Sequence, residues 1–179
     1  CIYGKTPVLL TFDGERDVRV EPVFPGAAAA LFLVDLAGRK DTVRILSDLR
    51  EAYPTADALR RALGPDNEAI VRQACAALTD GDAAALGALM AEAQALFDAR
   101  VAPHSPAELA SPLLHELLAF APIQSLTHGG KGVGSQGDGT AQFVARGPAQ
   151  RERAMAEIAR AFPSMRCFPL DIVPIAAGP

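Results

Sequence analysis

Apolar and polar residues alternate in the first part of the chain, which is the pattern of strands. Residues 8–12 form an apolar run that ends at Asp13-Gly14, a pair that favours a tight hairpin turn. Residues 17–21 then alternate valine with charged residues, which predicts a return strand. A further apolar run at residues 31–36 predicts a buried strand.

The middle of the chain instead carries apolar residues at three- and four-residue spacing, as in helices that bury one face. Asp41 and Asp82 are candidate N-caps, and Asp66 or Asn67 is expected to cap another helix. Lys40-Asp41-Thr42 is interpreted as a helix start rather than as a catalytic group. The helices expected from these signals cover residues 41–53, 55–63, 67–79, 82–97, 106–120 and 148–162.

Half of the residues in the segment 129–140 are glycine, and an apolar run at 141–145 predicts that a strand follows. A last strand is expected at residues 165–173. The order is strands, a helical block, and then β-loop-β-α-β. This order predicts an α+β fold, with a small, mostly antiparallel sheet and helices packed on one face.

Composition and charge exclude several classes of protein. The net charge of −4 argues against a nucleic-acid binder and against attraction to anionic membranes. The longest near-apolar run, residues 23–34, is too short to span a bilayer. Cys1, Cys75 and Cys167 are too sparse for a disulfide framework and lack zinc spacing, so a reducing, cytoplasmic setting is expected.

The glycine-rich segment is the strongest candidate for chemistry. Glycine lets the backbone approach a ligand closely, and successive exposed N–H groups bind anions. Lys131 adds a positive charge suited to phosphate. The segment fits neither a Walker loop, in which lysine follows the second glycine, nor the dinucleotide fingerprint, which opens a helix. The alternative interpretation is a flexible connection between core elements.

The run Lys131-Gly132-Val133-Gly134-Ser135-Gln136-Gly137-Asp138-Gly139 resembles the third motif of the GHMP kinases, Lys-x-x-Gly-Ala-Gly-Gly-Gly-Gly followed by a strand. This superfamily includes galactokinase, homoserine kinase, mevalonate kinase and phosphomevalonate kinase. Gln136 and Asp138 stand where the family usually has glycine. Asp138 would bring negative charge near phosphates unless it faces magnesium or turns away. Weaker similarities to the family lie at residues 1–14, 33–42 and 89–109.

The resemblance implies a kinase that uses ATP and Mg²⁺ to phosphorylate an alcohol group of a small metabolite, mevalonate-like or a sugar. It assigns the nucleotide phosphates to Lys131, Gly132, Gly134, Ser135, Gly137, Asp138 and Gly139. His128, next to this segment, is the candidate substrate contact. No metal-ligand spacing is found around the histidines.

The resemblance also implies how the chain divides. Residues 27–179 would be the ferredoxin-like C-terminal domain, and residues 1–26 a hairpin remnant of the upstream domain. The family's main phosphate loop, Pro-x-x-x-Gly-Leu-Gly-Ser-Ser, and its catalytic Asp-Gln pair have no counterpart in the sequence. The chain alone is therefore expected to be inactive, with the catalytic half in an upstream domain or a partner chain. The hairpin's open edge favours a homodimer.

A second hypothesis comes from a different functional class. Domains of this fold also serve as non-catalytic ligand-sensing or interaction modules, because a fold does not fix a function. Gln136 and Asp138, which depart from the glycine pattern, agree with this alternative. A glycine-serine phosphate loop and an Asp-Gln segment upstream would distinguish the kinase from the module.

Overall fold

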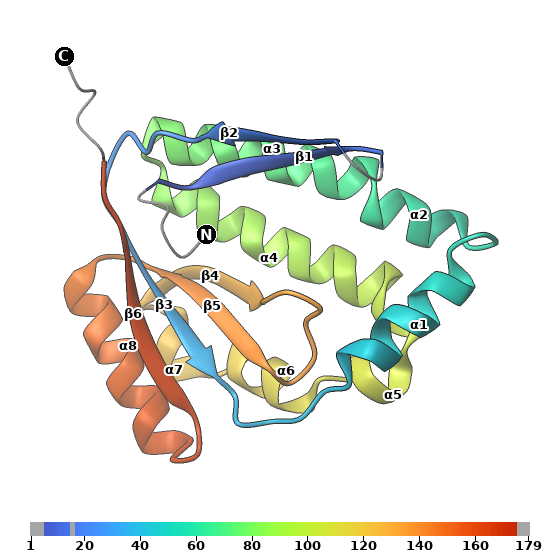
Figure 1. Ribbon diagram of the computed structural model, residues 1–179. Helices are drawn as coiled ribbons and strands as arrows, with labels where there is room; N and C mark the ends of the chain where they lie inside the picture. Colours follow the sequence, from blue (N-terminus) through green and yellow to red (C-terminus); the bar gives the residue numbers. More distant parts are fainter. Residues whose placement is uncertain (1–5, 15–16, 175–179) are drawn as a thin grey trace.

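The computed structural model describes residues 6–14 and 17–174 and contains a hairpin, a four-stranded sheet and a set of helices (Figure 1). Cys1, the similarity at residues 1–4, and the C-terminal residues 175–179 lie outside the described residues. The helices are α1 Thr42–Ala52, α2 Asp57–Leu63, α3 Pro65–Asp80, α4 Ala83–Arg100, α5 Pro106–Leu109, α6 Pro112–Leu118, α7 Ala121–Gln124 and α8 Pro148–Ala161, with a 3₁₀ turn at Ala102–His104. The predicted α+β fold class is confirmed.

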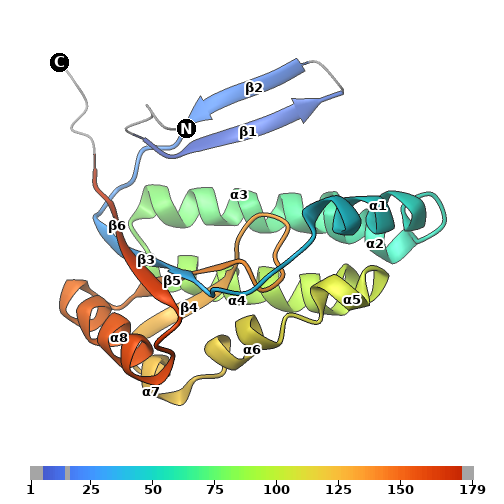
Figure 2. The same ribbon diagram turned by 60° about the horizontal axis from the view of Figure 1, so that its bottom comes forward.

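The N-terminal hairpin forms a sheet of its own. Strands β1, Val8–Asp13, and β2, Asp17–Pro22, pair antiparallel with Leu10 opposite Val20. The hairpin lies above α3, apart from the larger sheet (Figure 2). The apolar run at residues 8–12 and the alternation at residues 17–21 correctly predict the two strands.

The larger sheet is antiparallel throughout, with strand order β4-β5-β3-β6. Its strands are β3 Ala29–Asp35, β4 Thr127–Gly132, β5 Thr140–Ala145 and β6 Arg166–Ile172. Phe32 and Phe143 stack on one face, with ring centroids 5.1 Å apart, and helices α6, α7 and α8 complete that core. On the other face, Leu31 and Val144 pack against α3 and α4, so helices cover part of both faces rather than one.

Helix α4 packs its backbone directly on β4. A Cβ placed on Gly87 would lie 2.4 Å from the Cβ of His128, and one on Gly129 would lie 2.1 Å from the carbonyl oxygen of Gly87. Any larger residue at these two positions would force the helix away from the strand. This contact fixes the height of α4 over the strand that leads into the glycine loop.

Three differences from the sequence expectation have a clear physical reason. The helix expected at 106–120 is broken into α5 and α6, because Ser111 has φ +48° and Pro112 follows it. Helix α3 begins at Pro65 instead of being capped by Asp66 or Asn67, because proline fits the first helical turn, where no N–H partner is needed. The first part of the glycine-rich segment forms strand β4, so only residues 133–139 are loop.

Candidate functional site

The loop 133–139 connects β4 to β5 and has a defined shape. The N–H of Val133 donates to the carbonyl of Thr140 at 2.9 Å, and the N–H of Gln136 donates to the carbonyl of Val133 at 3.2 Å. Gly134 and Gly137 have φ of +66° and +69°, which glycine adopts without steric cost. These two hydrogen bonds and the two positive φ angles give the segment a turn conformation.

Several loop amides have no protein partner. Within residues 6–14 and 17–174, no acceptor takes the N–H groups of Gly134, Ser135, Gly137, Asp138 and Gly139. Gly134 is exposed, but the other four residues are buried or half-buried, where backbone donors without partners are rare. A run of N–H groups of this kind forms a concavity suited to an anion.

Lys40 supplies positive charge to this loop. Its Nζ donates to the carbonyl oxygen of Gln136 at 2.7 Å, and a Cβ placed on Gly139 would lie 2.8 Å from its Cε. Burial lowers the pKa of Lys40. The ammonium retains donors beyond the one bound to Gln136, since a lysine carries three. Lys40 was not among the residues that the sequence assigned to the site.

The start of α1 joins the loop beside Lys40. Asp41 caps the helix by accepting from the N–H of Arg44 at 3.0 Å, as the sequence predicts. The hydroxyl oxygens of Thr42 and Ser135 lie 3.3 Å apart and tie α1 to the loop. The segment Lys40-Asp41-Thr42 therefore both starts a helix and contributes to the site. The positive end of the helix dipole adds to the field at the loop.

Lys131 lies at the base of the loop, on the side of the sheet that faces α4. Its side chain lines a cavity of about 190 Å³ together with Asn67, Phe97 and Gln136. Its Nζ donates to the carbonyl of Gly132 at 2.6 Å, and burial lowers the pKa of Lys131. Gly134 lines the same cavity, so this lysine and the loop border one space.

The two residues that depart from the glycine pattern are accommodated in different ways. Gln136 takes φ +60°, the conformation that glycine favours, and is 5 % exposed. A Cβ on Gly132 would lie 2.7 Å from its Oε1, which has no hydrogen-bond partner among the described residues. Asp138 accepts from the N–H of Leu114 at 2.9 Å and so caps α6. That carboxylate oxygen is therefore turned toward α6, which is one of the two orientations that the sequence left open for Asp138.

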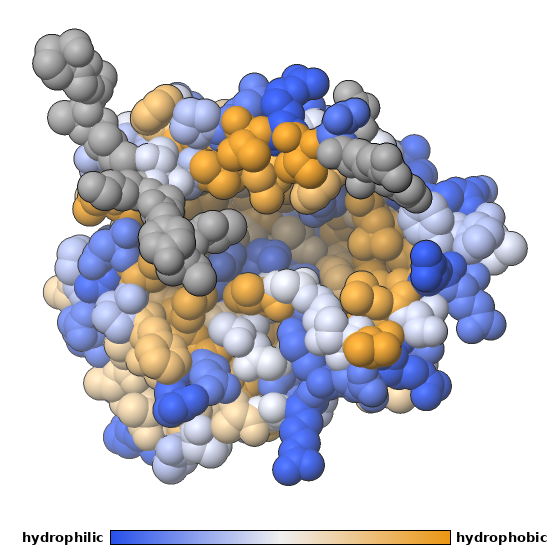
Figure 3. Space-filling view, viewed as in Figure 1, coloured by the Kyte–Doolittle hydropathy of each residue, from blue (hydrophilic) through white to orange (hydrophobic). Residues whose placement is uncertain are grey.

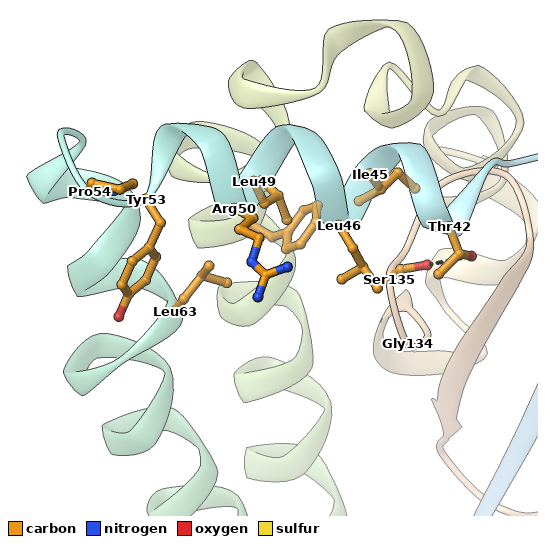
Figure 4. Close-up of a pocket in the computed structure, with 11 residues that line it drawn as sticks. Thr42, Ile45, Leu46, Leu49, Arg50, Tyr53, Pro54, Leu63, Gly134 and Ser135 are labelled. Carbon is orange, nitrogen blue, oxygen red and sulfur yellow. Dashed lines mark hydrogen bonds between the residues drawn. The ribbon is translucent and has the colours of Figure 1, made fainter. Parts of the chain in front are cut away.

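A groove runs from the loop along α1. It has a volume of about 810 Å³, and Figure 4 shows side chains of α1 pointing into it opposite Leu63 of α2. It is lined by Thr42, Ile45, Leu46, Leu49, Arg50, Tyr53, Pro54, Leu63, Phe97, Gly134 and Ser135. Thr42 and Ser135 form the end at the loop, so the anion-binding candidate opens directly into an apolar groove.

His128, the predicted substrate contact, is not brought to the loop. It lies at the β-bulge near the start of β4, whereas the loop follows the end of that strand. Burial, and second the nearby Arg146, lower the pKa of His128. Its contact with substrate stays a prediction.

In the part of the chain that the structure describes, no group of three or more His, Cys, Asp or Glu residues is arranged to hold a metal ion. His115 instead pairs with Asp98, with Nε2 and Oδ2 3.1 Å apart. No helix within the described ranges has the length and apolarity to cross a membrane.

Several solved kinases share this fold. The chain aligns with mevalonate kinase of L. major, with a TM-score of 0.79 and 19 % identity, over 98 % of this chain and 51 % of that one. Phosphomevalonate kinase of Streptococcus pneumoniae gives 0.67 and 15 %, over 88 % and 45 %. Galactokinase of Lactococcus lactis gives 0.64 and 13 %, over 96 % and 52 %. No protein-family model matches the sequence, and no curated protein matches it significantly.

These comparisons establish the fold. The chain spans about half the length of the kinases that it matches. The resemblance to GHMP kinases found in the sequence is thus confirmed at the level of the fold.

Proposed function

We propose that this chain is one part of an ATP-dependent kinase that phosphorylates an alcohol group of a small metabolite. The observation that carries the proposal is the loop 133–139, which has several unpartnered N–H groups, contacts Lys40 and borders the same cavity as Lys131. Two lysines and a row of amides make a fitting cradle for phosphate groups. The fold shared with three small-molecule kinases supports the same assignment.

In this proposal, bound ATP with Mg²⁺ supplies the transferable phosphoryl group. The bond between the γ-phosphorus and its bridging oxygen breaks, a bond to the acceptor oxygen forms, and ADP leaves. The acceptor's proton passes to a carboxylate base, which the resemblance assigns to the other half of the enzyme. Lys40 and the loop amides bind and orient phosphate oxygens, since phosphoryl transfer depends mainly on positioning and charge stabilisation. The acidic ligands of Mg²⁺ would come from that other half.

The hairpin is the proposed docking surface for the other half. Residue pairs Leu10–Val20 and Phe12–Val18 lie directly opposite, so these side chains share one face of the hairpin. They are 40 % exposed or more, and Phe12 reaches 68 %. Figure 3 shows apolar residues gathered there beside a hollow in this face of the molecule. Since the kinases of this fold are about twice as long, we expect an upstream domain or a partner chain to cover this surface.

In the isolated chain, the same surface is expected to drive self-association, giving a homodimer or larger species. Light scattering on the purified chain measures this directly. Phe12→Ser should shift the population to monomer, whereas Arg19→Ser, on the opposite face of the hairpin, should not. A monomeric profile for the unchanged chain contradicts the proposed docking surface.

The kinase proposal is tested on the complete native protein with ATP, Mg²⁺ and a panel of sugars and isoprenoid-type alcohols. Lys40→Met should raise the KM for ATP about 10- to 100-fold, the value of a lost charge-assisted hydrogen bond. Arg39→Gln, at the exposed neighbouring position, is the matched control and should leave it unchanged. Absence of turnover on every acceptor would overturn the enzyme assignment and favour a non-catalytic module.

A further inference from the structure

The groove along α1 has a chemistry that the phosphate loop alone does not explain. Leu46, Arg50 and Tyr53 follow one another at helical spacing on the side of α1 that faces Leu63 (Figure 4). Leu46, Tyr53 and Leu63 are 58 %, 46 % and 42 % exposed. Ile45, which also lines the groove, is fully buried. Helix α1 therefore has exposed apolar side chains along the groove in addition to the buried ones that pack it against the rest of the chain.

The lining of the groove contains one charged side chain, that of Arg50. No aspartate or glutamate lines the groove, and Arg50 points into it. At the loop end, Lys40 contacts the loop, and the Asp138 carboxylate accepts from the N–H of Leu114. Among the described residues, Arg50 forms no ion pair. An occupant that matches this surface carries negative charge at the loop and hydrocarbon along the helix.

The dimensions agree with such an occupant. From Thr42 at the loop to Tyr53 at the far end, the helix rises about 16 Å at 1.5 Å per residue. Between these ends, Arg50 is the one charged side chain in the lining. A sugar would need several hydrogen-bonding groups to be oriented, and this stretch of wall offers few.

We infer that the groove binds the hydrocarbon chain of an alkyl phosphate, with its phosphate at the loop 133–139. This rests on the proposed function and deepens it, because an alkyl phosphate is the product formed when the acceptor is an apolar alcohol. The acceptor class is thereby an alcohol on a hydrocarbon chain, and sugars are disfavoured. A protein segment that covers the groove is the competing occupant.

The test is calorimetric titration of the purified chain with inorganic, methyl, butyl and octyl phosphate, with octanol as the uncharged probe. Affinity should rise about 2- to 4-fold per added methylene as the groove fills. Leu46→Asn should flatten this increase, and Leu63→Asn on α2 should do the same independently. Val43→Asn is the control, because Val43 is 78 % exposed on α1 and does not line the groove. Circular dichroism verifies that each variant is folded.

The outcomes separate the two proposals. If inorganic phosphate binds and Lys40→Met weakens it, but chain length has no effect, the groove inference is overturned while the phosphate loop stands. If octanol binds as tightly as octyl phosphate, the anionic class of ligand is wrong. If no phosphate of any chain length binds, the loop assignment itself falls.

Discussion

Replacing Gly87 by alanine tests the contact that sets α4 on the strand leading into the site. In an exposed helix, glycine to alanine stabilises by about 1 kcal/mol, because alanine has the higher helix propensity. Gly87 is buried, however, and faces the backbone of β4. Helix propensity and packing therefore predict opposite signs for the change in unfolding free energy.

The geometry decides which effect is larger. The new Cβ would lie 2.4, 2.7 and 2.9 Å from the Cβ, carbonyl carbon and carbonyl oxygen of His128. Carbon atoms normally approach to about 3.5–4.0 Å, so α4 must move away by about 1 Å. Backbone atoms cannot rotate aside, and overpacking of this kind costs up to about 3 kcal/mol. After the propensity gain, we expect a net loss of about 2 kcal/mol.

The assay is thermal unfolding followed by circular dichroism. For a chain of this size, the expected loss lowers Tm by about 4–8 °C. Ala88→Gly, at the exposed adjacent position of α4, is the matched control and should lower Tm by about 2–4 °C through propensity alone. A rise in Tm for Gly87→Ala would refute the close packing of α4 on β4.

Three further predictions concern single groups. Asp138→Ala removes the cap on α6 and should lower the free energy of unfolding, measured in urea, by about 1 kcal/mol, and Asp138→Asn should lower it less. Equal unfolding free energies for the unchanged chain and both variants would contradict the cap. Burial lowers the pKa of His128, so its contribution to stability should be present above about pH 6.5 and be lost as the pH falls through its folded pKa. His128→Asn should remove that part of the pH dependence of Tm. An unchanged pH profile of Tm would contradict the burial of the imidazole. Burial raises the pKa of Cys167 to about 11, which lowers the fraction of reactive thiolate. In a variant with Cys1 and Cys75 replaced by serine, the Cys167 thiol should react with a disulfide reagent at pH 8 on the order of 100-fold more slowly in the folded protein than in urea. Equal rates would contradict the burial of the thiol.

The secondary structure could largely be predicted from the sequence, because local patterns determine it. The hairpin follows from alternation around Asp13-Gly14, and α4 follows from its Asp82 cap and apolar spacing. The break at Ser111 is missed because the leucines on both sides continue the helical pattern, although Pro112 is a sequence signal for a helix start there. Strand β4 could not either, because glycine is a poor strand former and is retained there by the close approach of α4.

The site was only partly predictable, for a related reason. The glycine loop is visible as composition, and Asp41 as a helix cap. The contact between Lys40 and Gln136 joins positions far apart in sequence, and a single lysine before a helix carries no signal of it. The groove depends on how α1 lies over α2, which apolar spacing alone cannot show, since the same spacing is typical of a fully buried helix.

The most direct test of the phosphate loop is a titration of the ¹⁵N-labelled chain with inorganic phosphate and then with ATP, observed by amide NMR shifts. The account predicts saturable shifts for Gly134, Ser135, Gly137 and Gly139, whose N–H groups have no protein acceptor among the described residues. Lys40→Met should weaken the binding, and Arg39→Gln should not. Shifts absent from the loop, or spread evenly over surface lysines and arginines, would contradict it.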